Sequence, residues 1–63
     1  MKGDQLRAAR KAAHLTQRRL GELMNMKHWR DLSHMESGNR YIGPGMEARI
    51  RLALMKAKQE HHT

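Results

Sequence analysis

The sequence contains no cysteine and no phenylalanine, and tryptophan and tyrosine each occur once. Without cysteine, neither a disulfide nor a thiolate metal site can support a small core, and nothing in the composition indicates an oxidising compartment. The longest apolar run, residues 52–55, is far shorter than the roughly 20 residues that span a bilayer. Residues 1–4 lack the apolar stretch of a signal peptide. We therefore expect a chain that folds by apolar packing alone and stays in the cytoplasm.

Side chains that favour β-strands are also scarce. The β-branched residues are Thr16, Ile42, Ile50 and Thr63, so the composition predicts an all-α fold. A chain of 63 residues provides one small domain, residues 1–63, without a cleft between lobes. An enzyme is not expected, because serine occurs only at positions 33 and 37 and no nucleophile–base set or carboxylate pair is recognisable.

Positive charge is the strongest compositional feature. Thirteen lysines and arginines against six aspartates and glutamates give a net charge of +7 at neutral pH. A polyanionic partner is the first hypothesis for such a chain, and we expect nucleic acid. We expect no cofactor and no metal site, since His61 and His62 lack partners at ligand spacing.

Four helices are predicted to account for nearly the whole chain, because apolar side chains recur at helical spacing in four stretches. Thr16 can cap a helix through its hydroxyl, and Asn25 and Gly38 suit the left-handed conformation that ends one. Proline suits a first helical position. We predict helices from Gly3 or Asp4 to about Ala13, at Gln17–Met24, from about His28 to Ser37, and from Pro44 to about Gln59.

The most specific feature is the segment LTQRRLGELMNM at residues 15–26, followed by LSHMESG at residues 32–38. Together with LRAARK at residues 6–11, it resembles the helix-turn-helix of the lambda-repressor/Cro-like (XRE) family of DNA-binding proteins. The resemblance covers roughly residues 5–54. It implies a compact domain of four to five helices with the helix-turn-helix at about residues 16–37, in which the second helix of the motif enters the major groove.

The sequence departs from the family pattern around the turns. His14 stands where the family usually has glycine, and a left-handed residue there costs about 1–2 kcal/mol. Asn25 replaces the glycine that ends the second helix. The stretch 26–32 is one residue longer than the commonest family spacing, which puts the register of residues 27–30 in question by one position. Gly21 stands where the family commonly has alanine and permits close approach of the following helix.

Helical spacing and the family pattern together imply which side chains reach DNA. Arg30 is the first candidate, because a guanidinium can donate two hydrogen bonds to guanine O6 and N7. Trp29 is either a core anchor or a contact with a thymine methyl group, and Asp31 either caps its helix or accepts from cytosine N4. The expected base contacts are Trp29, Arg30, Ser33 and His34. The expected phosphate contacts are Gln17, Lys27, His28, Asn39, Arg40 and Tyr41, with Arg7, Lys11 and Arg18 as weaker candidates.

Arg10 and Glu36 stand where the family has an arginine late in the first helix and a glutamate at the end of the recognition helix. The resemblance implies a partly buried ion pair with a structural role, for which the planar guanidinium is suited. Two ordinary surface charges are the alternative.

Leu52 and Met55 point partly away from the apolar stripe of the last predicted helix. An exposed apolar patch there suits a homodimer contact, which the family uses to address palindromic half-sites about one DNA turn apart. A frayed amphipathic tail is the alternative.

We therefore expect a sequence-specific transcriptional regulator that binds double-stranded DNA, in particular a repressor that occupies its operator as a homodimer. The resemblance is to compact repressors of phages and mobile elements, so we expect a prokaryotic or phage-encoded, nucleoid-associated protein. The alternative is an antitoxin-type interaction protein, which binds a toxin partner and autoregulates its operon. Such antitoxins usually need additional surface for the toxin, and few residues lie beyond the resemblance.

Overall fold

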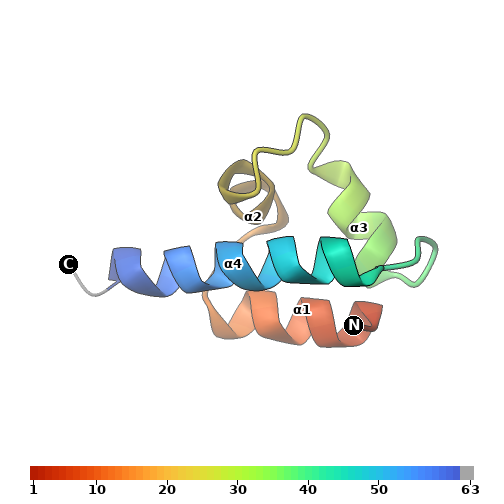
Figure 1. Ribbon diagram of the computed structural model, residues 1–63, viewed down its shortest axis with the longest axis horizontal. Coiled ribbons are helices and arrows are strands. Elements are labelled where there is room, and N and C mark those ends of the chain that lie inside the picture. The colour runs from red at the N-terminus through yellow and green to blue at the C-terminus, as the bar shows by residue number, and fades with distance from the viewer. Residues whose placement is uncertain (62–63) are drawn as a thin grey trace.

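The computed structural model describes the backbone of residues 1–61 and the side chains of residues 1–59. Its helices are α1 (Gly3–Ala12), α2 (Gln17–Leu23), α3 (Arg30–Glu36) and α4 (Pro44–His61) (Figure 1). Residues 1–61 contain no strand, so the all-α class is confirmed. No helix in this range combines the length and the apolar character that a bilayer crossing requires.

Two helix boundaries differ from the prediction by two residues, and the ends of α1, α2 and α3 each come one residue earlier than predicted. α3 begins at Arg30 instead of about His28, because the amides of Asp31 and Leu32 donate to the carbonyls of His28 and Trp29 at 3.1 and 3.0 Å. These are tight i→i+3 turns that lead into the helix. α4 continues past Gln59 to His61, since residues 53–59 are good helix formers without a glycine or proline stop. The expectation that His61 and His62 form no metal site concerns side chains outside the described residues.

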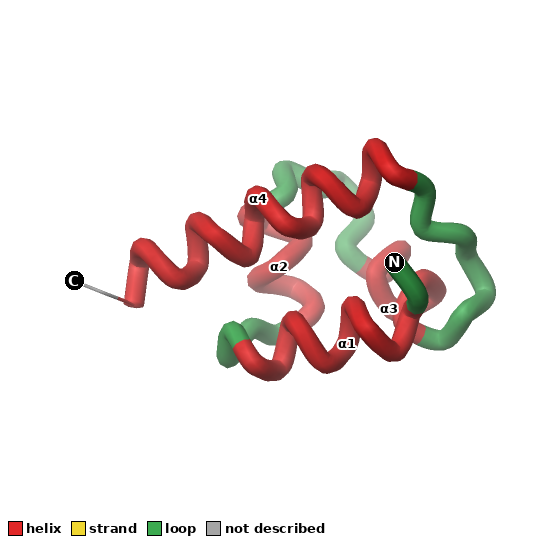
Figure 2. Tube along the Cα trace, turned by 60° about the horizontal axis from the view of Figure 1, so that its bottom comes forward, coloured by secondary structure: helices red, strands yellow, loops and turns green. Residues whose placement is uncertain are grey.

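The helices surround one apolar core. α1 and α4 run in similar directions along the long axis, and α2 and α3 pack across them (Figures 1 and 2). α3 contacts both α1 and α2, and α2 also contacts α4. All four helices contribute fully buried side chains, which are Leu6, Leu20, Leu32, Met35 and Ile50. The C-terminal turns of α4 extend past the end of α1 in both views.

Local hydrogen bonds define the ends of the short helices. The Thr16 hydroxyl accepts from the Arg19 amide at 3.0 Å, which confirms the predicted cap of α2. α1, α2 and α3 are each followed by a residue with positive φ, namely His14 (58°), Asn25 (56°) and Gly38 (86°). The amide of the residue that follows each of them donates to a carbonyl in the last helical turn, as in a Schellman motif. These hydrogen bonds join the Leu15 amide to the Arg10 carbonyl, the Met26 amide to the Gly21 carbonyl and the Asn39 amide to the His34 carbonyl. His14 therefore adopts the left-handed conformation that costs about 1–2 kcal/mol at this position.

Among the side chains that the structure describes, two polar contacts fix α4 to the rest of the domain. The Met1 ammonium group lies 2.6 Å from Glu47 Oε1, and its hydrogen bond and positive charge lower the pKa of the Glu47 carboxyl below its usual value. Arg49 Nη2 donates to the carbonyl of Met24, which caps the C-terminus of α2, at 3.1 Å. α4 thus holds the end of α2 from which the chain turns toward α3.

Gly21 sets the approach of α2 to the start of α3. It is buried, and a Cβ atom at this position would overlap the Trp29 Cβ and lie 3.2 Å from the Trp29 Cα. Rotation of the Trp29 side chain cannot relieve that overlap, because neither atom moves with χ1. The predicted close approach is present, and the residue that makes it is Trp29.

Gly21→Ala is therefore expected to lower the free energy of unfolding by about 1–3 kcal/mol, because the backbone around Trp29 must shift. Urea denaturation followed by circular dichroism measures the change. The matched control is Gly45→Ala in the first turn of α4, where an added Cβ meets no atom within 4 Å. Equal stability of the two variants would contradict the packing described above.

Candidate nucleic-acid interface

α3 turns one face to the core and the other to solvent. Leu32 and Met35 are buried, while Arg30, Ser33 and His34 are exposed. These three are the base-contact candidates that helical spacing predicted within this helix. The fourth, Trp29, precedes α3 as its N-cap residue and is half-buried.

A basic and aromatic hollow lies at the start of α3. It has a volume of about 320 Å³ and is lined by Lys27, His28, Trp29 and Arg30. The Arg30 guanidinium lies over the Trp29 ring, 5.9 Å from its centroid, at the outer limit of a cation–π contact. Trp29 thus anchors the turn through its contact with Gly21 and also forms a wall of the hollow. Trp29 belongs neither to the apolar core nor to the partly buried side chains packed against it, so the core-anchor alternative is wrong.

A second hollow of about 250 Å³ lies where α1 and α2 meet the C-terminal half of α3. Its lining is polar and consists of Arg7, Arg10, Gln17, Ser33, Glu36 and Ser37. Arg7, a weaker phosphate candidate in the sequence, is exposed here beside Gln17. Ser37 was missed by sequence reasoning, although its spacing of four residues from Ser33 places both on one helical face.

Arg10 and Glu36 form the ion pair that the resemblance implied. Arg10 Nε and Nη2 donate to the two Glu36 carboxylate oxygens at 2.7 and 3.1 Å. The side chains are 12% and 5% exposed, so the pair is not one of ordinary surface charges. Arg10 Nη1 also donates to the Leu15 carbonyl at 2.8 Å, and Gln17 Nε2 donates to Glu36 Oε1 at 3.3 Å. This cluster connects α1, the α1–α2 turn, α2 and α3.

Gln17 and Arg40, both expected to contact phosphate, have protein partners as well. Gln17 is half-buried and is held by Glu36 as described. Arg40 Nη1 lies 3.2 Å from Asp31 Oδ2, and both side chains are partly exposed. The N-cap residue Trp29 makes no side-chain cap hydrogen bond, and Asp31, in the first turn of α3, pairs with Arg40.

The loop after α3 continues this surface. Asn39 and Arg40 are exposed, and Tyr41 is 84% exposed. Lys11 is exposed at the end of α1, and Arg18 forms an exposed pair with Glu22 on α2. Leu52 and Met55 lie on the outer face of α4 and are 55% and 59% exposed, as a contact surface requires.

Comparison with known proteins assigns no family to this chain. No family model matches the chain, and neither a curated protein nor a solved structure is significantly similar to it. Within the part of the chain that the structure describes, no three histidine, aspartate or glutamate side chains gather as a metal site would need. The side chains around α3 supply hydrogen-bonding groups, positive charge and one aromatic ring.

Glu36→Ala is expected to lower the free energy of unfolding by about 3–5 kcal/mol, because it leaves the nearly buried Arg10 guanidinium without its counter-charge. The midpoint of thermal or urea unfolding measures the loss. Glu22→Ala is the matched control, since Glu22 pairs with Arg18 and Arg19 at an exposed site and is expected to contribute about 0–1 kcal/mol. If Glu36→Ala leaves the unfolding midpoint unchanged, the Arg10–Glu36 pair does not contribute to stability and the prediction is wrong.

Proposed function

We propose that the chain binds double-stranded DNA with α3 in the major groove and regulates transcription, as a repressor that occupies its operator. The observation that carries the proposal is the position of α3. Its exposed Arg30 lines the basic, aromatic hollow, its exposed Ser33 lines the polar hollow, and His34 is exposed on the same helix. An α-helix fits a major groove about 12 Å wide, and the flanking surfaces then face the two phosphate backbones. The resemblance to the lambda-repressor/Cro-like helix-turn-helix supports the same assignment.

In this proposal, bases and phosphates are contacted by different residues. Arg30 donates to a guanine edge, and Ser33 and His34 supply shorter hydrogen-bonding groups along the same helix face. Lys27 and His28 attract phosphate at the start of α3, and Gln17 and Arg7 face the backbone from the second hollow. The charge of +7 adds a long-range attraction that does not depend on sequence.

The Arg10–Glu36 cluster supports such binding because it limits how α3 can move. A helix that must place several side chains on base edges binds best when its position is set before binding. The bidentate pair and the Gln17 amide hold the C-terminal end of α3 against α1 and α2. The Trp29–Gly21 contact holds the segment that leads into its N-terminal end.

The antitoxin-type alternative keeps the DNA-binding domain and adds a protein partner. The observation in its favour is the exposed apolar pair Leu52 and Met55 on α4. A repressor of the family would use that pair for a second copy on a palindromic operator with half-sites about one turn apart. The two alternatives differ in what covers α4, not in what α3 does.

Affinity for duplex DNA is expected to fall with added salt, with a slope of log affinity against log salt of about −0.9 for each neutralised phosphate. Fluorescence anisotropy of a labelled duplex, titrated at several salt concentrations, gives the slope. Failure to bind any duplex at low ionic strength, or binding that salt leaves unchanged, would refute the proposal.

Arg30→Ala is expected to remove about 1–3 kcal/mol of binding free energy for the preferred base at one position, and the preference for that base is then relaxed. Lys27→Ala is expected to lower the affinity for all duplexes alike. It is also expected to make the slope of log affinity against log salt less steep by about 0.9, the value for one phosphate. Selection of bound sites from random duplexes, followed by affinity measurements, separates the two effects. Lys56→Ala removes the same charge from α4 and serves as the control. Identical behaviour of the Arg30 and Lys27 variants would contradict the division between base and phosphate contacts.

A further inference from the structure

The outer face of α4 carries an apolar seam that no other part of the described chain covers. Leu52 and Met55 are exposed there, and Ala48 and Gln59 extend the line in both directions. The spacing of four, three and four residues is the a/d spacing of a heptad repeat, which places these side chains on one stripe of the helix. The inner face of the same helix is occupied by the core residues Ile50, Ala53 and Ala57.

Both edges of the seam are basic. With Leu52 and Gln59 at a positions and Ala48 and Met55 at d positions, the e positions are Arg49 and Lys56 and the g positions are Arg51 and Lys58. All four flanking side chains are exposed. Within the side chains described, the one carboxylate of α4 is Glu47, which binds the Met1 ammonium group and also pairs with Arg51, one of the two g-position cations.

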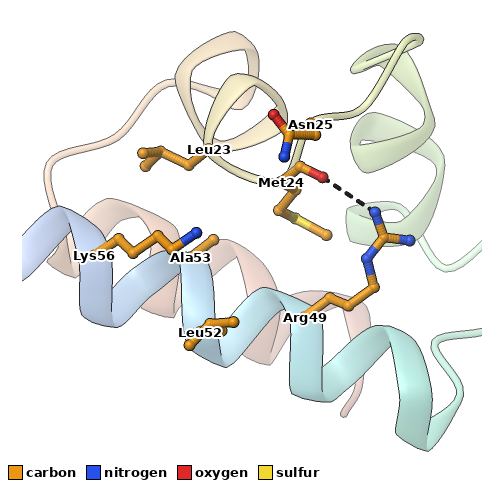
Figure 3. A pocket seen from close by; sticks show the side chains of 7 residues that line it. All are labelled: Leu23, Met24, Asn25, Arg49, Leu52, Ala53 and Lys56. Atoms are coloured by element: carbon orange, nitrogen blue, oxygen red, sulfur yellow. Dashed lines mark hydrogen bonds between the residues drawn. The ribbon is translucent and has the colours of Figure 1, made fainter.

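Hollows on both sides of the seam can accept partner side chains. One, of about 220 Å³, lies between α4 and the end of α2, with Leu23, Leu52 and Ala53 in its lining and Arg49 and Lys56 beside them (Figure 3). Arg49 is held in place there by its hydrogen bond to the Met24 carbonyl. The other, of about 290 Å³, is lined by Arg51, Leu54, Met55 and Lys58. Each combines apolar surface with positive charge.

This charge pattern opposes a second copy of the chain as the occupant. In a parallel pair of helices, g positions face e positions of the partner, and in an antiparallel pair e faces e and g faces g. Either arrangement of two α4 helices sets arginine and lysine against arginine and lysine. Like charges at these positions select against self-pairing, and opposite charges select a different partner.

We propose that the outer face of α4 binds an acidic amphipathic helix of another protein. The apolar stripe of that helix packs on Leu52 and Met55, and its flanking aspartate or glutamate side chains face the four cations. Duplex DNA is a poorer fit to this face, because the seam between the cations consists of Ala48, Leu52 and Met55, with Gln59 as its one hydrogen-bonding side chain. The inference is independent of the DNA-binding proposal, since it concerns a different face of the domain.

The test uses the complete chain and two synthetic helices, without DNA. Both peptides carry leucine at the a and d positions, one with glutamate and one with lysine at every e and g position, so neither pairs strongly with itself. Fluorescence anisotropy measures the binding of each. The glutamate peptide is expected to bind at least about tenfold more tightly than the lysine peptide. Equal affinities, or no binding of the glutamate peptide, would overturn the proposal.

Charge-reversed variants identify the binding face. Lys56→Glu with Lys58→Glu is expected to lower the affinity for the glutamate peptide about tenfold and to raise the affinity for the lysine peptide. The matched control, Lys11→Glu with Lys27→Glu, makes the same change in net charge away from α4 and is expected to leave peptide affinity within about twofold. Circular dichroism verifies that each variant is folded. A control variant that loses as much affinity as the α4 variant would reduce the effect to net charge and contradict the proposal.

The other occupants give distinct results. If the chain alone forms a dimer by sedimentation equilibrium and Leu52→Asp makes it monomeric, a second copy covers this face and the proposal fails. If the α4 variant loses as much DNA affinity as Lys27→Glu alone, the face contacts DNA and the proposal also fails. If the unaltered chain fails to bind duplex DNA but binds the glutamate peptide, the DNA-binding function is refuted and the proposal for α4 stands.

Discussion

The bidentate contact between Arg10 and Glu36 is the interaction on which the proposed interface depends. Arg10 lies in the last turn of α1, Glu36 is the last residue of α3, and Gln17 at the start of α2 donates to the same carboxylate. A nearly buried ion pair offsets its own desolvation only in part. Its main effect is therefore on orientation, because few positions of the three helices satisfy all of its hydrogen bonds. Loss of either partner is costly, since the other charge then remains buried.

The short helices depend on this contact and on the core because neither is stable alone. α2 and α3 have seven residues each, well below the roughly 12–15 at which an isolated helix becomes even marginally stable in water. The Thr16 cap and the left-handed residues Asn25 and Gly38 satisfy their end groups, and buried Leu20 and Leu32 fix their inner faces. The position of α3 is consequently set both by exposed residues at the helix ends and by buried side chains on the inner faces.

The domain presents two basic surfaces that differ in what accompanies the charge. Around α3, the cations are accompanied by hydroxyl, imidazole and amide groups, which suit base edges and phosphates. On the outer face of α4, the cations border Leu52 and Met55, which suit an apolar stripe on another helix. Both surfaces are positively charged, so charge alone does not distinguish a nucleic-acid partner from a protein partner. The uncharged side chains that lie among the cations make that distinction.

Local chemistry in the sequence determined the all-α class, the Thr16 cap and the helix ends at Asn25 and Gly38, because each depends on residues within one turn. The start of α3 was misplaced, since it depends on how Trp29 packs against Gly21 on the preceding helix. The Arg10–Glu36 pair, 26 residues apart in sequence, followed from the family resemblance and not from spacing. Only the tertiary structure decided the pairing of Arg40 with Asp31 and the hollows beside α3, because these arise where separate elements meet.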